Sequence, residues 1–263
     1  MFRLIKIELI KLWCHNAIRA YIIIWIVLFC ILRFNFRTSL TTALISKKLN
    51  QNIWYELMGF RMFDIWLISF LIGFIVLVQF QMEHRNNMLK QIRLLPISSY
   101  YFFCIKLIAL LITSFVFLMI YGCVYGVCTY YIGLTSYPDL NFKAHSFWNT
   151  IPFQLTIILK IYISLWGYLS ILALLNMYIR NVILGAALIV LLWLPNIKGA
   201  WYSKYSPSNF ATRSNYLFYK QFKFSDTSIS ELNPFQYEIY SVIILIIVLI
   251  LSFILNFKKK LVI

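Results

Sequence analysis

The sequence predicts an all-α protein that crosses a membrane with six transmembrane helices, and two observations carry this prediction. First, 62% of its 263 residues are hydrophobic and 12% are charged, whereas about a quarter of the residues in a soluble domain are charged. Second, runs such as VILGAALIVLLWL and YSVIILIIVLILSFIL have no polar stripe that could face water, so lipid must be their solvent and helices their structure. We expect residues 1–263 to form a single transmembrane domain.

The first segment, 1–16, is expected to lie as an amphipathic helix in the plane of the membrane surface. A basic polar face opposite Trp and Leu is typical of helices that rest among lipid headgroups. The polar face carries Arg3, Lys6, Glu8 and Lys11. The apolar face follows the 3.6-residue helical period and comprises Phe2, Ile5, Leu9, Leu12 and Trp13.

Six apolar stretches are expected to span the bilayer, at about 17–32, 65–80, 100–122, 152–175, 182–196 and 237–257. The first and fifth are short against the roughly 20 residues that a bilayer requires, so flanking residues must contribute. The third continues in apolar sequence to about Ile132, which predicts that it tilts or projects beyond the membrane. Within it, Gly122-x-x-x-Gly126 could admit a close neighbour, but in so apolar a chain we interpret the match as chance.

The even number of spans places both termini on the same side of the membrane. Arg and Lys are denser in the N-terminal helix, the segment 81–99, the turn 176–181 and the tail than in the three opposite loops. Because cytoplasmic loops carry the excess of cations, we expect both termini in the cytoplasm. The longest polar stretch, 197–236, then lies outside, and its many aromatic residues predict a segment that dips into the membrane interface.

The strong positive charge of the chain, +16 at neutral pH, raises the question of nucleic acid. Its Lys and Arg residues are scattered among loops and span ends and form no continuous basic groove in the sequence. Attraction to anionic lipid and the orientation of the spans explain the charge more simply. We therefore expect membrane lipids as partners and no nucleic acid.

The segment 81–99, QMEHRNNMLKQIRLLPISS, lies between the second and third spans and follows a helical period. Met88, Leu89, Ile92 and Leu95 share one face, and the opposite face is polar. Pro96 then ends the helix and Ser98 or Ser99 can cap the next span. A loop that merely reversed the chain would need no such pattern, so we interpret the segment as a docking helix. The alternative is a plain interfacial helix resting on headgroups.

Motifs of catalysis and cofactor binding are absent from the sequence. It contains no GxxxxGK[ST], HExxH or GxSxG motif. Its three histidines lie in separate loops, and its five cysteines lie within or beside apolar runs or in the N-terminal segment. We therefore expect no catalytic residue, no metal site and no cofactor bound by this chain.

Two lysines lie inside predicted spans. Lys106, about six residues into the third span, can extend to the cytoplasmic headgroups. Lys160 lies deeper, about eight residues past Pro152, and a charge at depth is a candidate for the substrate path that requires a partner. Asp64, at the matching end of the second span, is one such partner. In the alternative, residues up to Phe153 lie in the interface and Lys160 is shallow.

Taken together, these features resemble a type-2 ABC-transporter permease over nearly the whole chain. The N-terminal helix is similar to the interfacial connecting helix of that family, and Glu83–Ser99 resembles its coupling-helix loop. The segment 197–236 stands where such permeases fold two short helices back into the outer leaflet. The pattern E-x6-K-x5-P-x-S, from Glu83 to Ser98, is similar to the loop of small permeases from bacterial lantibiotic-immunity and peptide-export systems.

The resemblance implies the partners and the location. Two permease chains, identical or paralogous, would pair in the bacterial cytoplasmic membrane, and two separate ATPase subunits would carry the ATP and Mg²⁺. The apolar face of the coupling helix would fill a groove on the ATPase while its charges set the register. The residues expected in this contact are Glu83, Arg85, Met88, Leu89, Lys90, Ile92, Arg93 and Leu95.

The implied function is export or expulsion of a peptide or an amphipathic, lipid-like substrate, which suits spans that are aliphatic and aromatic. Two other classes stay open. A channel or ion-coupled carrier working without ATP should hold coupling charges inside its spans, and Lys160 alone qualifies. A membrane scaffold that transports nothing would have no associated ATPase.

Overall fold

The structure is a computed structural model that describes residues 2–35, 62–85, 98–136, 147–179, 181–193 and 235–261, with five positions between 207 and 214. Within these ranges the chain is helical and contains no strand. The predicted all-α class is therefore confirmed for the part of the chain that the structure describes.

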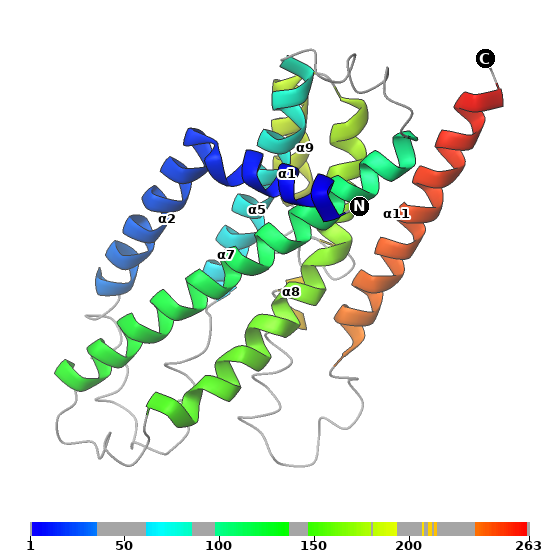
Figure 1. Ribbon diagram of the computed structural model, residues 1–263. Coiled ribbons are helices and arrows are strands. Elements are labelled where there is room, and N and C mark those ends of the chain that lie inside the picture. The colour runs from blue at the N-terminus through cyan, green and yellow to red at the C-terminus, as the bar shows by residue number, and fades with distance from the viewer. Residues whose placement is uncertain are drawn as a thin grey trace.

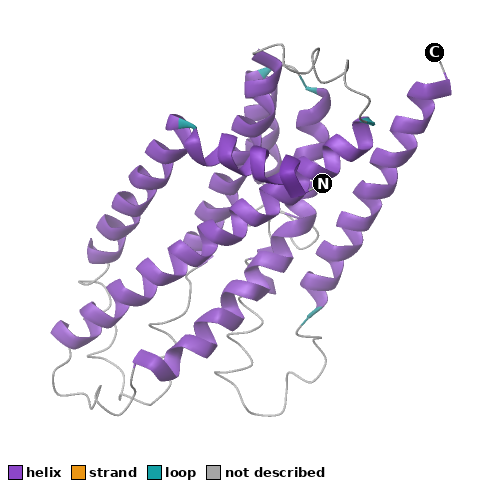
Figure 2. Cartoon of the chain, in the orientation of Figure 1, coloured by secondary structure: helices purple, strands orange, loops and turns teal. Residues whose placement is uncertain are grey.

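Seven long helices make up this part of the molecule (Figure 1, Figure 2). They are α1 (Phe2–Cys14), α2 (Asn16–Asn35), α5 (Met62–Arg85), α7 (Ser99–Ser136), α8 (Phe147–Tyr178), α9 (Val182–Trp193) and α11 (Gln236–Leu261). In Figure 1, α7 and α8 run slantwise through the bundle, α2 and α11 flank it, and α1 lies across α7. The end of α5, the start of α7 and the end of α11 lie at the same end of the bundle.

Three of the described helices are long and apolar enough to cross a membrane. Their spanning stretches are Tyr100–Val127, Gln154–Tyr178 and Gln236–Leu255. The pair α1 and α2, bent by 64°, counts as a fourth if it forms one broken span, and α5 and α9 contain shorter apolar stretches. The structure therefore confirms a membrane protein, and the number of six spans stays a prediction.

The third predicted span forms a single helix, α7, of 38 residues. At 1.5 Å per residue it is about 57 Å long, well beyond the roughly 30 Å of bilayer hydrocarbon. The expectation that it tilts or projects is confirmed. Its start is capped as predicted, because the Tyr101 amide donates a hydrogen bond to Ser98 Oγ at 3.2 Å.

The fourth span begins earlier than predicted. We expected it to start at Pro152, but α8 starts at Phe147 and contains the proline. A proline in the early turns of a helix forfeits a single backbone hydrogen bond and keeps a helical φ. The Pro152 carbonyl accepts a hydrogen bond from Thr156 Oγ1 at 2.8 Å. Proline therefore did not mark the boundary.

The turn between α8 and α9 is shorter than the predicted 176–181. Asn176 still belongs to α8, where its side-chain amide donates to the Leu172 carbonyl at 2.9 Å. Asn181 caps α9, because its Oδ1 accepts the Ile183 amide at 2.9 Å. The two helices therefore follow one another closely.

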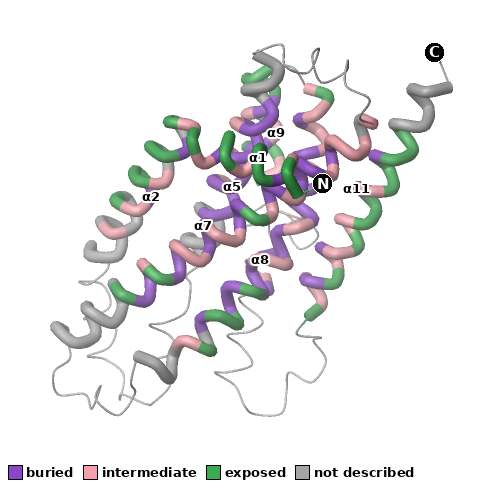
Figure 3. Tube along the Cα trace, viewed as in Figure 1, coloured by how far each residue is buried: buried purple, intermediate pink, exposed green. Residues whose placement is uncertain are grey.

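The core lies where α5, α7 and α8 meet, and Figure 3 shows the buried positions along their facing sides. Our interpretation of the Gly122-x-x-x-Gly126 match as chance is wrong. A Cβ at Gly122 would lie 2.3 Å from Ile158 Cδ1, and one at Gly126 would lie 2.9 Å from Gln154 Oε1. The two glycines therefore admit α8 close to α7, which is the physical use of this spacing in membrane helices.

The helix α11 is joined to the bundle mainly through α8. The Gly167 amide donates a hydrogen bond to Ser241 Oγ at 2.7 Å. A Cβ on Gly167 would lie 3.1 Å from the Ser241 carbonyl oxygen and 3.2 Å from Ile244 Cβ. The opposite side of α11 is exposed, with Ile250 54% accessible. The contact at Gly167 therefore has little room to adjust.

Replacing Gly167 by Val should separate α8 from α11, since the added atoms meet backbone that cannot turn away. We expect a loss of about 1–3 kcal/mol in stability, measured as a lower unfolding temperature of the purified protein in detergent. Leu159→Phe adds volume to an exposed position of the same helix and should leave that temperature unchanged. An equal loss in both variants would contradict the close contact at Gly167.

Candidate functional site

The predicted ATPase-docking residues fall mostly outside the described part of the chain. Glu83 and Arg85 belong to the last turn of α5, with backbone but not side chains described. We expected the docking segment to begin at Gln81, whereas α5 continues as helix to Arg85. The other six residues lie within 86–97, outside the described residues: Met88, Leu89, Lys90, Ile92, Arg93 and Leu95. Their role stays a prediction.

A buried ion pair joins α1 to α7 directly beside this segment. Lys106 is fully buried, and its Nζ lies 3.6 Å from Glu8 Oε2. The other oxygen of Glu8 lies 2.8 Å from Lys11 Nζ. Burying a charge in an apolar bundle is costly unless an opposite charge accompanies it. Glu8 provides that charge for Lys106.

The same lysine also contacts α5. Its ammonium lies 5.0 Å from the ring centres of both Phe80 and Phe102, a distance at which cations are attracted to aromatic faces. Gln79 Nε2 donates a hydrogen bond to the Lys106 carbonyl at 3.3 Å. Three helices therefore meet at this residue. We call this group, Glu8, Lys11, Gln79, Phe80, Phe102 and Lys106, the α1–α7 junction.

The expectation that Lys106 extends to the headgroups is therefore wrong. The helix α1 lies across the bundle at the level of Lys106 (Figure 1). Its carboxylate takes the place that lipid phosphates would otherwise have. Sequence reasoning assigned Glu8 to the polar face of a surface helix and did not foresee this pairing.

The helix α1 turns a different face to the protein from the apolar face defined by periodicity. Its buried residues are Ile5, Glu8 and Leu12. Leu9 and Trp13 pack against the cluster formed by Leu12, Ile18 and Ala109, whereas Phe2 is 89% exposed. The protein-facing side is thus rotated toward Glu8, because α7 offers the ammonium of Lys106 there.

The corner between α1 and α2 is held by a hydrogen bond. Arg19 Nε donates to the Trp13 carbonyl at 2.8 Å. This satisfies one of the carbonyls that the end of a helix leaves without an internal partner. The sharp bend between the two helices therefore has a specific contact behind it.

A second buried ion pair joins α8 to α11. Lys160 Nζ lies 3.7 Å from Glu238 Oε1 and 4.2 Å from the ring centre of Phe235. Ser214 Oγ donates a hydrogen bond to the same carboxylate oxygen. Lys160, Glu238 and Ser214 are all buried. We call these four residues the α8–α11 junction.

The α8–α11 junction lies at one end of the spanning stretches. Glu238 belongs to the first turn of α11, and Lys160 lies six positions into the apolar stretch that begins at Gln154. Lys160 is thus neither at the centre of the bundle nor exposed to headgroups. The side chain of its expected partner, Asp64, lies outside the described residues. Whether Lys160 and Asp64 belong to a substrate path stays a prediction.

Sequence reasoning did not single out Glu238. An acid in the first turn of a span reads as a flanking residue that favours the positive end of the helix dipole. The available signal was a lysine inside one span and an acid at the matching end of another, since buried charges pair.

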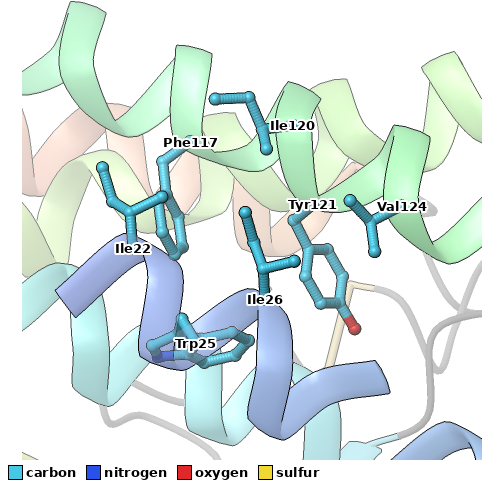
Figure 4. Close-up of a pocket in the computed structure, with 7 residues that line it drawn as sticks. All are labelled: Ile22, Trp25, Ile26, Phe117, Ile120, Tyr121 and Val124. Carbon is cyan, nitrogen blue, oxygen red and sulfur yellow. The ribbon is translucent and has the colours of Figure 1, made fainter. Parts of the chain in front are cut away.

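The packing between α2 and α7 leaves a small apolar hollow (Figure 4). Its lining residues are Ile22, Trp25, Ile26, Phe117, Ile120, Tyr121 and Val124. The Trp25 ring meets those of Phe117 and Tyr121 edge-on, with centres 5.8 Å and 6.0 Å apart. No charged side chain lines it, so it has no group to orient a polar cargo. Elsewhere in the described ranges, no three His, Cys, Asp or Glu side chains come together as metal ligands.

Comparison with known proteins gives one match. A family described as "ABC-2 family transporter protein" matches residues 4–196. No curated protein matches the chain, and no solved structure matches it. The matched region contains α1 to α9 and the whole α1–α7 junction, and it ends before Glu238.

Neutralising one member of the α8–α11 pair should destabilise the protein more than removing both. In Lys160→Met a buried carboxylate loses its cation, a loss of about 3–5 kcal/mol, and Glu238→Gln should behave similarly. The double variant Lys160→Met/Glu238→Gln should lose less than the sum of the two. Thermal unfolding in detergent measures all three. Strictly additive losses would show that the two side chains do not interact.

Proposed function

Since this chain belongs to the ABC-2 transporter family and is the membrane subunit of an ABC transporter, we propose that it exports or expels a peptide or an amphipathic, lipid-like substrate. The observation that carries the proposal is the family match over residues 4–196. Family membership implies partner ATPase subunits. We further propose two of these, together with a second permease chain that is identical or paralogous.

The place of docking in this proposal is the segment 86–97. It connects the end of α5 to the start of α7, and both lie at one end of the bundle (Figure 1). A groove on the ATPase would receive Met88, Leu89, Ile92 and Leu95, as amphipathic helices are received elsewhere. The charges of Glu83, Arg85, Lys90 and Arg93 would set the register.

Movement follows from the rigidity of the two helices. Closure of the ATPase subunits around ATP would push on the segment 86–97 and so displace the ends of α5 and α7. Because packed helices move as rigid bodies, the two permease chains would rock between inward-facing and outward-facing states. ATP and Mg²⁺ would stay on the ATPase subunits throughout.

The nature of the cargo is proposed from the chemistry of the bundle. Lys106 and Lys160 each lie within ion-pair distance of a glutamate. A charge held in a pair is a poor coupling site for an ion. Apolar and aromatic helices instead suit an amphipathic cargo. The loop pattern that resembles lantibiotic-immunity and peptide-export permeases favours a peptide.

Docking through the apolar face of 86–97 is tested by two charges placed on it. Leu89→Asp with Ile92→Asp should abolish copurification of the ATPase, because a buried carboxylate in the groove would lack a partner. ATP-dependent transport should be lost as well. Asn86→Asp with Asn87→Asp adds the same charge to neighbouring polar positions and should preserve copurification.

Two results would count against this account in different ways. If the Leu89/Ile92 variant retained its ATPase, the assignment of the docking segment would be wrong. If the unmodified protein carried no ATPase when purified in mild detergent, the proposed export function would be wrong, and a channel, carrier or scaffold would remain.

The proposed location is the bacterial cytoplasmic membrane with both termini inside. In a cysteine-free background, Lys90→Cys should be protected from a membrane-impermeant maleimide applied to whole cells. Lys143→Cys, in the opposite loop, should react. Labelling of the Lys90 variant from outside would reverse the orientation and remove the ATPase from reach.

A further inference from the structure

Resting on the proposed function, we propose that Glu8 and Lys106 are positioning residues that carry the motion of the docking segment from α7 to the N-terminal helix α1. By this proposal α1 is a moving part of the transporter and not a passive anchor in the membrane surface. The buried ion pair between the two side chains is the connection.

The pair lies close to the docking segment on both of its sides. Lys106 is seven residues after the start of α7 at Ser99, or about 10 Å at helical rise. Gln79 and Phe80, which contact Lys106, lie within about 9 Å of the end of α5 at Arg85. Any displacement of 86–97 therefore reaches Lys106 through one or two helical turns.

The ion pair can transmit motion that the surrounding contacts cannot. Apolar contacts such as those of Leu12 with Ala109 are non-directional and allow one helix to slide over another. Separating Glu8 from Lys106 would instead leave a charge without its partner in an apolar site. The free-energy cost of that separation fixes the position of α1 on α7.

A passive surface anchor would not require this arrangement. The exposed side of α1 already has Phe2, Ile7 and Ile10 beside the cations Arg3 and Lys6, which suffices for attachment to anionic headgroups. Such an anchor gains nothing from a buried carboxylate, whose desolvation is unfavourable. The burial of Glu8 against α7 therefore points to a mechanical connection.

The motion would continue into α2. The Arg19 side chain holds the Trp13 carbonyl across the corner, so α1 and α2 turn together. The far part of α2 meets α7 at the apolar hollow around Trp25 (Figure 4), where the contacts are rings and aliphatic side chains. These contacts can shift with less resistance than a buried ion pair.

The experiment uses the complex of this chain with its ATPase in lipid nanodiscs, in a cysteine-free background. Spin labels at Ile10→Cys on α1 and Ile250→Cys on α11 report one distance, and labels at Ile112→Cys on α7 and Ile250→Cys report another. All three positions are exposed. Each distance is measured by electron–electron resonance without nucleotide and after trapping with ATP, Mg²⁺ and vanadate.

In the unmodified complex both distances should change on trapping. In Glu8→Gln and in Lys106→Met, the α7–α11 change should remain and the α1–α11 change should be lost. Lys11→Met removes the second cation on Glu8 but leaves the connection to α7, and it should keep both changes. Glu238→Gln breaks the comparable pair at the α8–α11 junction and should also keep the α1–α11 change.

The outcomes separate this inference from the proposed function. A full α1–α11 change in Glu8→Gln and Lys106→Met would overturn the role of the pair. The double variant Glu8→Gln/Lys106→Met removes both charges, so it applies the same test should a single variant fail to yield intact complex. Absence of an ATPase, or of any nucleotide-dependent change in the unmodified protein, would instead overturn the export function on which the inference rests.

Discussion

A charge enclosed in an apolar helical bundle must lie near an opposite charge, and this requirement determines how the ends of this bundle are held together. Removing an ion from water is costly, and a partner in contact offsets most of that cost. Lys106 meets Glu8 and Lys160 meets Glu238, each across two helices. One pair joins α1 to α7 and the other joins α8 to α11. The ion pairs thus supply specific connections in a structure whose remaining contacts are largely apolar.

Between these two connections the helices are held by close approach. Glycines at 122, 126 and 167 bring α7, α8 and α11 near enough for side chains to meet backbone. In lipid there is little hydrophobic drive for helices to associate, so packing and interhelical hydrogen bonds provide the attraction. The bond from the Gly167 amide to Ser241 is one example. The resulting bundle can transmit displacement along its length, which an ATP-driven transporter requires.

The sequence was sufficient for those features that depend on apolar runs and local capping. The all-α class, the length of α7 and the cap at Ser98 followed from run length and side-chain type. Pairings between distant segments were not accessible in this way. Glu8 looked like a surface residue because its burial depends on α7, and Gly122 and Gly126 looked accidental because their use depends on α8. Pro152 suggested a boundary that the tolerance of early helical turns for proline removed.

The central claim is that a separate ATPase drives this bundle through the segment between α5 and α7. An electron cryo-microscopy map of the complex, purified through this chain in lipid without nucleotide, tests it most directly. The account predicts density for ATPase subunits in contact with residues 86–97, at the end of the bundle where Glu8 meets Lys106. Density for a partner at the opposite end, or a map that contains the permease chains alone, would contradict it.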